Sequence, residues 1–392
     1  METYSHKYLK TKEVLIHIGI LVFPFVLPLP TPLNIKSICF IIFLTTLLLN
    51  ISVKSVDFKK ILSNKIVVLF LILYSLDPIL SIIRGNEFYL RDLRLSFLIA
   101  PTIFMLNAGL LNKYKDKILM VFVFGTFGYI VFTVFFIIYF YTNSVETLAF
   151  DYFLKYVTYH YLPYSIHHTY IGIYLCFTSA IILFKTKINL YVKLLLNFIL
   201  FASVLIIASK LTIIFFVILF FTYFLIDLKW TFLKRTLLIA TLVLSFLLIL
   251  TLYIKTDLFR TLSVSINERK DLFKCSIEGI NSNLFLGIGN DNVKNYIANC
   301  NSDLGLKNTH NIFLQEFLSN GVLGIIILCV LFYIFIRFFL KVQSILGVTL
   351  IVMILFFGLV EHLFNLQNGV LFFIPFLLLI FYTCNFGLRS KS

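Results

Sequence analysis

Long apolar runs constrain the fold of this chain more than any other feature of its sequence. An α-helix needs about 20 apolar residues to cross the hydrocarbon core of a bilayer. The chain has 392 residues, of which 60% are hydrophobic and 13% are charged, a composition typical of a polytopic membrane protein. We therefore expect an all-α fold with about twelve transmembrane helices, near residues 13–30, 35–53, 65–83, 95–111, 118–141, 167–184, 190–209, 211–227, 236–254, 312–336, 343–360 and 370–386.

The positions of the basic residues predict the orientation in the membrane. With the N-terminus placed in the cytoplasm, 20 of the 33 Lys and Arg residues fall on the cytoplasmic side and 13 on the outer side. Lys and Arg are enriched in the cytoplasmic loops of helical membrane proteins, so we expect both termini to be cytoplasmic. The net charge of +15 is thus a topology signal, and no nucleic-acid partner is expected.

One long polar segment interrupts the series of apolar runs. Residues 255–310 would form an outer loop with short helices, between nine spans in 1–254 and three spans plus a short cytoplasmic tail in 311–392. This loop carries seven of the 13 outer basic residues. Long connections in compact proteins are usually functional, so we expect active residues here. Cys275 and Cys300 both lie in the loop, and an oxidising compartment would allow a disulfide between them.

His310 and Asn311 stand where the loop meets the tenth predicted span. One interpretation is structural: Asn311 caps the start of a helix, and Gly321 and Gly324 permit close helix packing. The other is functional: imidazole titrates near neutral pH, so His310 can act as a general base or can orient an acceptor hydroxyl. The residues alone leave both open.

Three further features are candidates for binding an anion. Arg269 begins an amphipathic stretch and fits either a solvated loop helix or a guanidinium that clamps phosphate. Gly287 and Gly289 fit a tight turn, whose backbone N–H groups can also line an anion. Lys210, after the seventh span, either extends its side chain to the interface or contacts a phosphate.

Ionisable residues at the outer ends of other spans complete the candidates, because charge beside the hydrocarbon is costly unless it is used. They are Arg91 and Arg94 after the third span, His168 at the start of the sixth, and Glu361 with His362 after the eleventh. A helix terminus with a purely structural role remains the alternative at each position.

The motifs resemble those of the O-antigen ligase and O-antigen polymerase superfamily. The spacing His310-Asn311, nine residues, Gly321, two residues, Gly324 resembles one family motif. Arg269 with residues 286–289 (Leu-Gly-Ile-Gly) resembles the family's Arg and Pro-Leu-Gly-Val-Gly segment, although residues 283–285 lack its common proline. Residues 208–210 (Ala-Ser-Lys) resemble a Ser-Arg at the outer end of a central helix, with Lys in place of Arg. The motifs cover roughly residues 205–325.

The resemblance implies a metal-independent glycosyltransferase in the bacterial inner membrane, with its active site facing the periplasm. The donor would be a glycan on undecaprenyl diphosphate. The acceptor would be a lipid-linked repeat unit for a polymerase, or the lipid A core saccharide of lipopolysaccharide for a ligase. No cofactor is expected, because no outer segment contains Asp-x-Asp.

The resemblance also implies roles for the candidate residues. His310 and Arg269 would be catalytic, and the cations Lys210, Arg91 and Arg94 would stabilise the charge that develops on the diphosphate. The other residues expected to contact substrate are Asn311, Gly287, Gly289, His168, Glu361 and His362.

Two other classes of protein fit the apolar runs. A twelve-helix transporter or a flippase of lipid-linked oligosaccharide would commonly show internal repeats and charges near the membrane midplane. The two halves of this sequence show no such similarity, and the polar candidates gather at one face, which favours the enzyme. A purely structural subunit would leave the His-Asn-Gly-Gly spacing to chance.

Overall fold

The computed structural model describes residues 2–51, 56–85, 95–143, 166–207, 209–226, 258–364 and 366–389. Within these residues every regular element is a helix and no strand occurs. The predicted span at 236–254 lies outside the described residues, as do Arg91 and Arg94. The all-helical class is confirmed, while the number of twelve spans stays a prediction.

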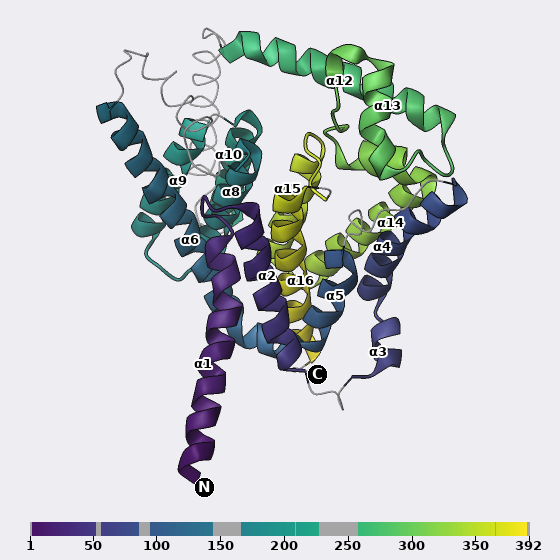
Figure 1. Ribbon diagram of the computed structural model, residues 1–392. Coiled ribbons are helices and arrows are strands. Elements are labelled where there is room, and N and C mark those ends of the chain that lie inside the picture. Colours follow the sequence, from purple (N-terminus) through teal and green to yellow (C-terminus); the bar gives the residue numbers. More distant parts are fainter. Residues whose placement is uncertain are drawn as a thin grey trace.

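The first half of the described chain contributes six helices to the bundle (Figure 1). They are α1 (Glu2–Val26), α2 (Leu33–Leu49), the short α3 (Phe58–Leu62), α4 (Lys65–Ile83), α5 (Leu95–Leu106) and α6 (Ala108–Asn143). Asn64 begins α4 as an N-cap, because its side-chain oxygen accepts hydrogen bonds from the backbone N–H groups of Ile66 and Val67.

The second half of the described chain adds six helices and a cap. The helices are α8 (His168–Phe184), α9 (Leu190–Ile207), α10 (Lys210–Ile226), α14 (Ile312–Lys341), α15 (Ile345–Gly358) and α16 (Gln367–Arg389), and α14 runs obliquely in the view of Figure 1. Between α10 and α14, α12 (Leu258–Ser282) and α13 (Val293–Cys300) lie across one end of the bundle (Figure 1).

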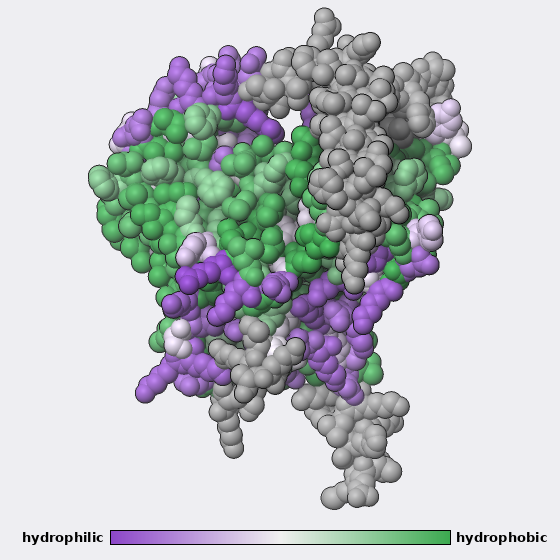
Figure 2. Space-filling view, turned by 180° about the vertical axis from the view of Figure 1, so that it is seen from behind, coloured by the Kyte–Doolittle hydropathy of each residue, from purple (hydrophilic) through white to green (hydrophobic). Residues whose placement is uncertain are grey.

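Hydropathy identifies the membrane-embedded part. Among the described residues, five helices are long and apolar enough to cross a bilayer, namely α4, α6, α9, α14 and most of α16. Further apolar helices of 10–17 residues accompany them. Figure 2 shows a broad hydrophobic belt between polar ends, with exposed side chains such as Phe135 and Phe198. An exposed apolar surface of this extent indicates lipid contact, and the chain is a multi-pass membrane protein.

The core lies around α8 and α16. Every residue from 169 to 183 is buried, which is expected of a helix that is apolar on all sides and surrounded by others. Phe122 of α6 packs edge-to-face against Phe177 of α8 and Phe376 of α16, with ring centroids 5.7 and 4.9 Å away. Aromatic packing between distant segments thus fixes how these three helices lie together.

One local prediction is wrong and another is confirmed only in part. Residues 113–117, between the predicted spans at 95–111 and 118–141, do not form a loop but continue α6, because Lys113 and Lys117 reach water with their side chains while the backbone stays helical. The loop 255–310 does hold a short helix, α13 with 8 residues, but α12 reaches 25 residues. Its apolar positions face a small core of their own, which stabilises a long helix without a membrane.

Candidate functional site

The first half of α14 ends at a break in the helix. Gly321 has φ 62° and ψ −159°, so the helical hydrogen-bond pattern is interrupted there. The loop 284–289 supplies replacements: the N–H groups of Ile288 and Gly289 donate to the carbonyls of Leu318 and Ser319, each at 2.9 Å. Val322 N–H donates in turn to the Leu284 carbonyl at 2.9 Å. The loop therefore satisfies backbone groups that the break would leave unpaired.

Glycine is required on both sides of this junction. Gly287 has φ 67°, and a Cβ there would overlap the Ser319 carbonyl. Gly321 has φ 62°, and a Cβ there would overlap the Phe285 carbonyl. The left-handed conformation alone favours glycine, and the close backbone approach excludes any side chain. Two sequence motifs more than thirty residues apart thus form one structural unit.

The predicted anion contact at Gly287 and Gly289 stays a prediction. The Gly287 amide donates to the Asn283 carbonyl and the Gly289 amide to the Ser319 carbonyl. Both amides are therefore engaged in holding the junction together.

Arg84 is a buried residue of the site that sequence reasoning did not select. It follows α4, and its Nη1 donates to the Ser319 carbonyl at 3.0 Å while its Nε donates to the Leu80 carbonyl at 2.9 Å. Its Nη2 lies 3.9 Å from the carboxylate of Asp77, and its side chain is only 9% exposed. The signal that would have found it is an acid and an arginine seven residues apart on one apolar helix, a costly arrangement unless the two are paired.

A carboxylate with two histidines lies beside the start of α14. Glu361 follows α15, and its Oε2 lies 3.8 Å from Nδ1 of His310. Its Oε1 lies 3.9 Å from Nδ1 of His167 and accepts a hydrogen bond from the Thr169 hydroxyl at 3.1 Å. Three segments far apart in sequence therefore meet at one buried carboxyl group.

The surroundings of Glu361 favour its ionised form. Burial alone would raise the pKa of Glu361, but His310, His167 and the Thr169 hydroxyl together hold that pKa below its ordinary value. Burial lowers the pKa of His167, against the opposing effect of Glu361, and the nearby His310 lowers it further. The cluster therefore favours a carboxylate beside a neutral imidazole at His167.

The backbone places His310 with a conformation that few residues adopt. His310 has φ 49°, and left-handed non-glycine residues often mark functional sites. Asn311 then caps α14, because its Oδ1 accepts from the N–H groups of Phe313 and Leu314. Its Nδ2 donates to the Leu359 carbonyl at 3.1 Å, two residues before Glu361. Asn311 thus ties the segment that carries His310 to the segment that carries Glu361, and its predicted contact with substrate stays a prediction.

Arg269 lies on α12 and is exposed. The preceding residue, Glu268, accepts a hydrogen bond from Lys307 Nζ at 2.7 Å, and Lys307 stands three residues before His310. α12 is therefore anchored next to the segment that carries the histidine. Arg269 itself makes no ion pair with any described residue, so its predicted contact with a phosphate stays a prediction.

The cap formed by α12 and α13 has its own core. Cys275 and Cys300 form a disulfide across it, as the sequence hypothesis proposed. Buried Leu272, Ile280, Val293 and Ile297 pack with Leu318 of α14. The cap is therefore bound both to itself and to the broken half of α14.

Comparison with known proteins bears directly on this region. Residues 195–329 match the O-Antigen ligase family. The resemblance to the O-antigen ligase and polymerase superfamily is confirmed. No curated protein matches the chain. The matched segment includes Lys210, α12, the 286–289 loop, His310 and the helix break.

Glu361, which the sequence predicted to contact substrate, and His167 lie outside the O-antigen ligase match, and the structure shows that both lie close to the site of His310. His168, expected to contact substrate, begins α8, and Lys210 begins α10. The two helices lie against each other near these ends, because a Cβ on Gly172 would overlap the side chain of Thr212. His362 is buried next to Glu361, with 3% exposure. Direct contacts of these residues with substrate stay predictions.

The hairpin of α9 and α10 also contains an apolar groove. Its volume is about 480 Å³. Its lining is almost wholly aliphatic and aromatic and consists of Leu194, Leu195, Asn197, Phe198, Phe201, Phe216, Val217 and Phe220. Lys210 lies at the start of the same α10 helix, six residues before Phe216.

Proposed function

We propose that the protein transfers a glycan from undecaprenyl diphosphate to a saccharide hydroxyl at the end of the bundle that carries His310. The observation that carries this proposal is the meeting of His310, which lies inside the segment matched to the O-antigen ligase family, with His167 and Glu361, which lie outside that segment. We further propose that this end faces the periplasm, since the basic residues favour a cytoplasmic opposite end and the Cys275–Cys300 disulfide suits an oxidising compartment.

The reaction forms one bond and breaks one. The acceptor hydroxyl oxygen bonds to the anomeric carbon of the donor, and the bond from that carbon to the diphosphate oxygen breaks. His310 takes the hydroxyl proton on Nε2, because Nδ1 is directed to Glu361. The ionised carboxylate fixes the ring and stabilises the imidazolium that forms. The distance of 3.8 Å shortens when substrate binds, as is common for catalytic hydrogen bonds.

The departing undecaprenyl diphosphate needs positive charge. Arg269 and Lys210 are the described candidates, with Arg91 and Arg94 outside the described residues. Arg84 differs from them, because its guanidinium already bonds to two backbone carbonyls. We assign Arg84 to positioning the helix break, and Arg269 and Lys210 to the diphosphate.

The polyprenyl tail needs an apolar path beside the diphosphate site. The groove between α9 and α10 meets this need, because its lining is apolar and it lies on the helix that begins with Lys210. We propose that the first isoprene units of the donor occupy this groove.

The test uses purified protein in vesicles with a lipid-linked glycan donor. Arg269→Ala should lower the transfer rate on the order of 10²-fold, whereas Lys270→Ala, which removes a neighbouring exposed charge from α12, should change it less than about twofold. Equal effects of the two substitutions would remove Arg269 from the mechanism. Transfer should persist in EDTA, and a strict need for a divalent metal would contradict the role given to Arg and Lys.

The surface glycan of a deletion strain separates the two activities of the superfamily. Acceptors that carry one repeat unit indicate a polymerase. Polymer that remains on the lipid carrier indicates a ligase.

A further inference from the structure

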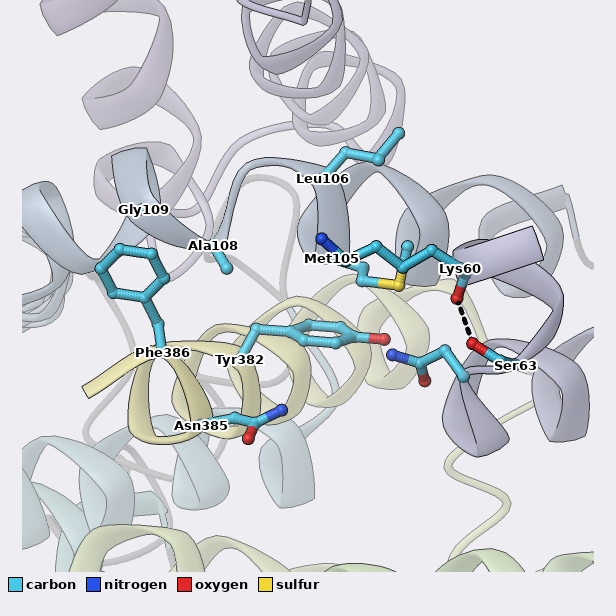
Figure 3. Close-up of a pocket in the computed structure, with 10 residues that line it drawn as sticks. Lys60, Ser63, Met105, Leu106, Ala108, Gly109, Tyr382, Asn385 and Phe386 are labelled. Atoms are coloured by element: carbon cyan, nitrogen blue, oxygen red, sulfur yellow. Dashed lines mark hydrogen bonds between the residues drawn. The ribbon is translucent and has the colours of Figure 1, made fainter. Parts of the chain in front are cut away.

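A cavity with a mixed polar and apolar lining lies at the opposite end of the bundle from His310. Its volume is about 490 Å³, and it is formed where α3, α4, α5, α6 and α16 meet (Figure 3). Its lining residues are Lys60, Ser63, Asn64, Met105, Leu106, Ala108, Gly109, Tyr382, Asn385 and Phe386. We call it the Lys60 cavity. None of the residues given a role in glycan transfer lines it.

The described lining of the Lys60 cavity suits an anion. It contains one cation, Lys60, and no carboxylate among the described residues. The starts of α4 and α6 border it at Asn64 and Ala108, while α3 and α5 end beside it at Ser63 and Leu106, so helix termini of both signs meet here. The Ser63 hydroxyl already donates to the Lys60 carbonyl at 2.9 Å (Figure 3), so the amide groups of the two asparagines are the neutral donors beside Lys60.

Tyr382 supplies a further donor inside the cavity. The residue is 2% exposed, and its hydroxyl points towards the side of the cavity that holds Ser63 (Figure 3). Its oxygen is buried beside the Asn64 side-chain amide, which can donate to it, and no group among the described residues accepts the hydroxyl proton. A buried hydroxyl without an acceptor costs free energy, which a bound acceptor would recover.

The same cavity has an apolar side that a small free anion would not use. Met105, Leu106 and Phe386 line it together with the polar groups. Beside it, α3 exposes Phe58 and Leu62 at 74% and 65%, next to Lys59 and Lys60. A short helix with bare apolar residues and adjacent lysines is typical of the boundary between headgroups and acyl chains.

We propose that the Lys60 cavity binds the headgroup of one anionic phospholipid, such as phosphatidylglycerol. Lys60 contacts the phosphate, Tyr382 donates to one of its oxygens or to the glycerol, and the acyl chains leave along Met105 and Phe386. Basic pockets between helices at the cytoplasmic side of a membrane commonly take such lipids. The proposal uses the predicted orientation of the chain but not its activity.

Lipid titration of the full-length protein tests this site. Delipidated protein in detergent is titrated with phosphatidylglycerol, phosphatidylcholine or inorganic phosphate, and bound lipid is measured by native mass spectrometry. Lys60→Gln should weaken phosphatidylglycerol binding roughly fivefold, the ratio expected for one basic side chain near an anionic surface. Lys59→Gln is the matched control on the same helix and should bind as the wild type does.

Each other outcome decides against the proposal. Equal binding by the Lys60→Gln and Lys59→Gln variants, or equal binding of phosphatidylcholine by the wild type, would overturn it. Competition by inorganic phosphate at similar concentration would assign the cavity to a free anion. Tyr382→Phe, which keeps the ring, gives a second measurement if Lys60→Gln fails to fold, and unchanged phosphatidylglycerol binding by it would also count against the site. Glycan transfer by these variants is not part of the readout, so failure here leaves the proposed function standing.

Discussion

Ionisable side chains at the two ends of the bundle differ in how deeply they are buried when Glu361 and Arg84 are compared with the pair of Lys113 and Glu13. At the His310 end, the side chains of Glu361 and Arg84 are 6% and 9% exposed and contact segments far away in the sequence. At the Tyr382 end, Lys113 and Glu13 lie 3.6 Å apart, but both are more than 60% exposed. An exposed ion pair contributes about 0–1 kcal/mol, whereas a buried charge is costly unless its partners are in place. We therefore take buried charged residues as marks of a functional site, and exposed lysines as a reflection of the orientation in the membrane.

The largest expected effect tests this separation directly. His310→Ala should lower glycan transfer on the order of 10³-fold, because a positioned proton acceptor is lost. Lys113→Ala, at the Tyr382 end, should leave the rate unchanged, because its partner remains hydrated. The rates are measured with purified protein and lipid-linked donor. A loss below about tenfold for His310→Ala would make the histidine a structural residue.

The second largest expected effect concerns the stability of the cap formed by α12 and α13. Cys275 and Cys300 are 25 residues apart and joined, whereas Cys384 at the Tyr382 end is a free thiol. Replacing both disulfide cysteines with Ser should destabilise the cap by about 3 kcal/mol on the chain-entropy argument.

Proteolysis of residues 258–304 should report this loss, and reductant should reproduce it in the wild type. Cys384→Ser is the control and should retain the sensitivity of the wild type to reductant. A cap that resists protease equally in all forms would show that the apolar cluster around Leu272 suffices.

The sequence predicted the positions of the apolar helices better than it predicted which residues of the site lie together. Apolar runs mark helices wherever lipid replaces water, and α4 begins and ends at residues 65 and 83, as expected. The break at Asn107 was missed, because a single residue that leaves the helical pattern carries no hydropathy signal. The pairing of His310 with Glu361 joins residues 51 positions apart. Such a contact depends on how α14, α8 and α15 pack, which no local pattern encodes.

The third expected effect is a loss of stability at the junction between the 286–289 loop and α14. Gly321→Ala should destabilise the protein by roughly 3 kcal/mol. An alanine there would have a strained backbone with positive φ, and its Cβ would also overlap the Phe285 carbonyl. Gly305→Ala is a matched control, since Gly305 has the same φ of 62° but nothing within 4 Å of its Cβ position. Its cost should be about 1 kcal/mol from strain alone. Thermal unfolding in detergent measures both, and equal losses would mean that the loop does not hold the break.

The smallest effect concerns stability in acid, where the two ends should again differ. The pKa of Glu361 is lower in the folded protein than its ordinary value of 4.5. Glu361 therefore stabilises the fold above that value, and this contribution is lost as the pH falls through the lower folded pKa. His167 also stabilises the fold more at high pH than at low pH, but its contribution is lost at a higher pH. Because its pKa is lowered in the folded protein, stability declines as the pH falls below the ordinary value of 6.5.

Unfolding temperatures measured from pH 7 to pH 3 separate these contributions. Glu361→Gln should remove the part of the decline below pH 4.5 that this carboxyl group causes. It should leave the decline that begins below pH 6.5, since His167 still titrates and loses the carboxylate that raises its pKa. Glu13→Gln, which alters the exposed pair at the Tyr382 end, should follow the wild-type curve because that pair contributes little. If Glu361→Gln and Glu13→Gln gave the same curve, the carboxyl group at the His310 end would behave as a solvated surface charge. The burial that distinguishes the two ends would then have no energetic consequence, and the choice of Glu361 as the partner of His310 would fail with it.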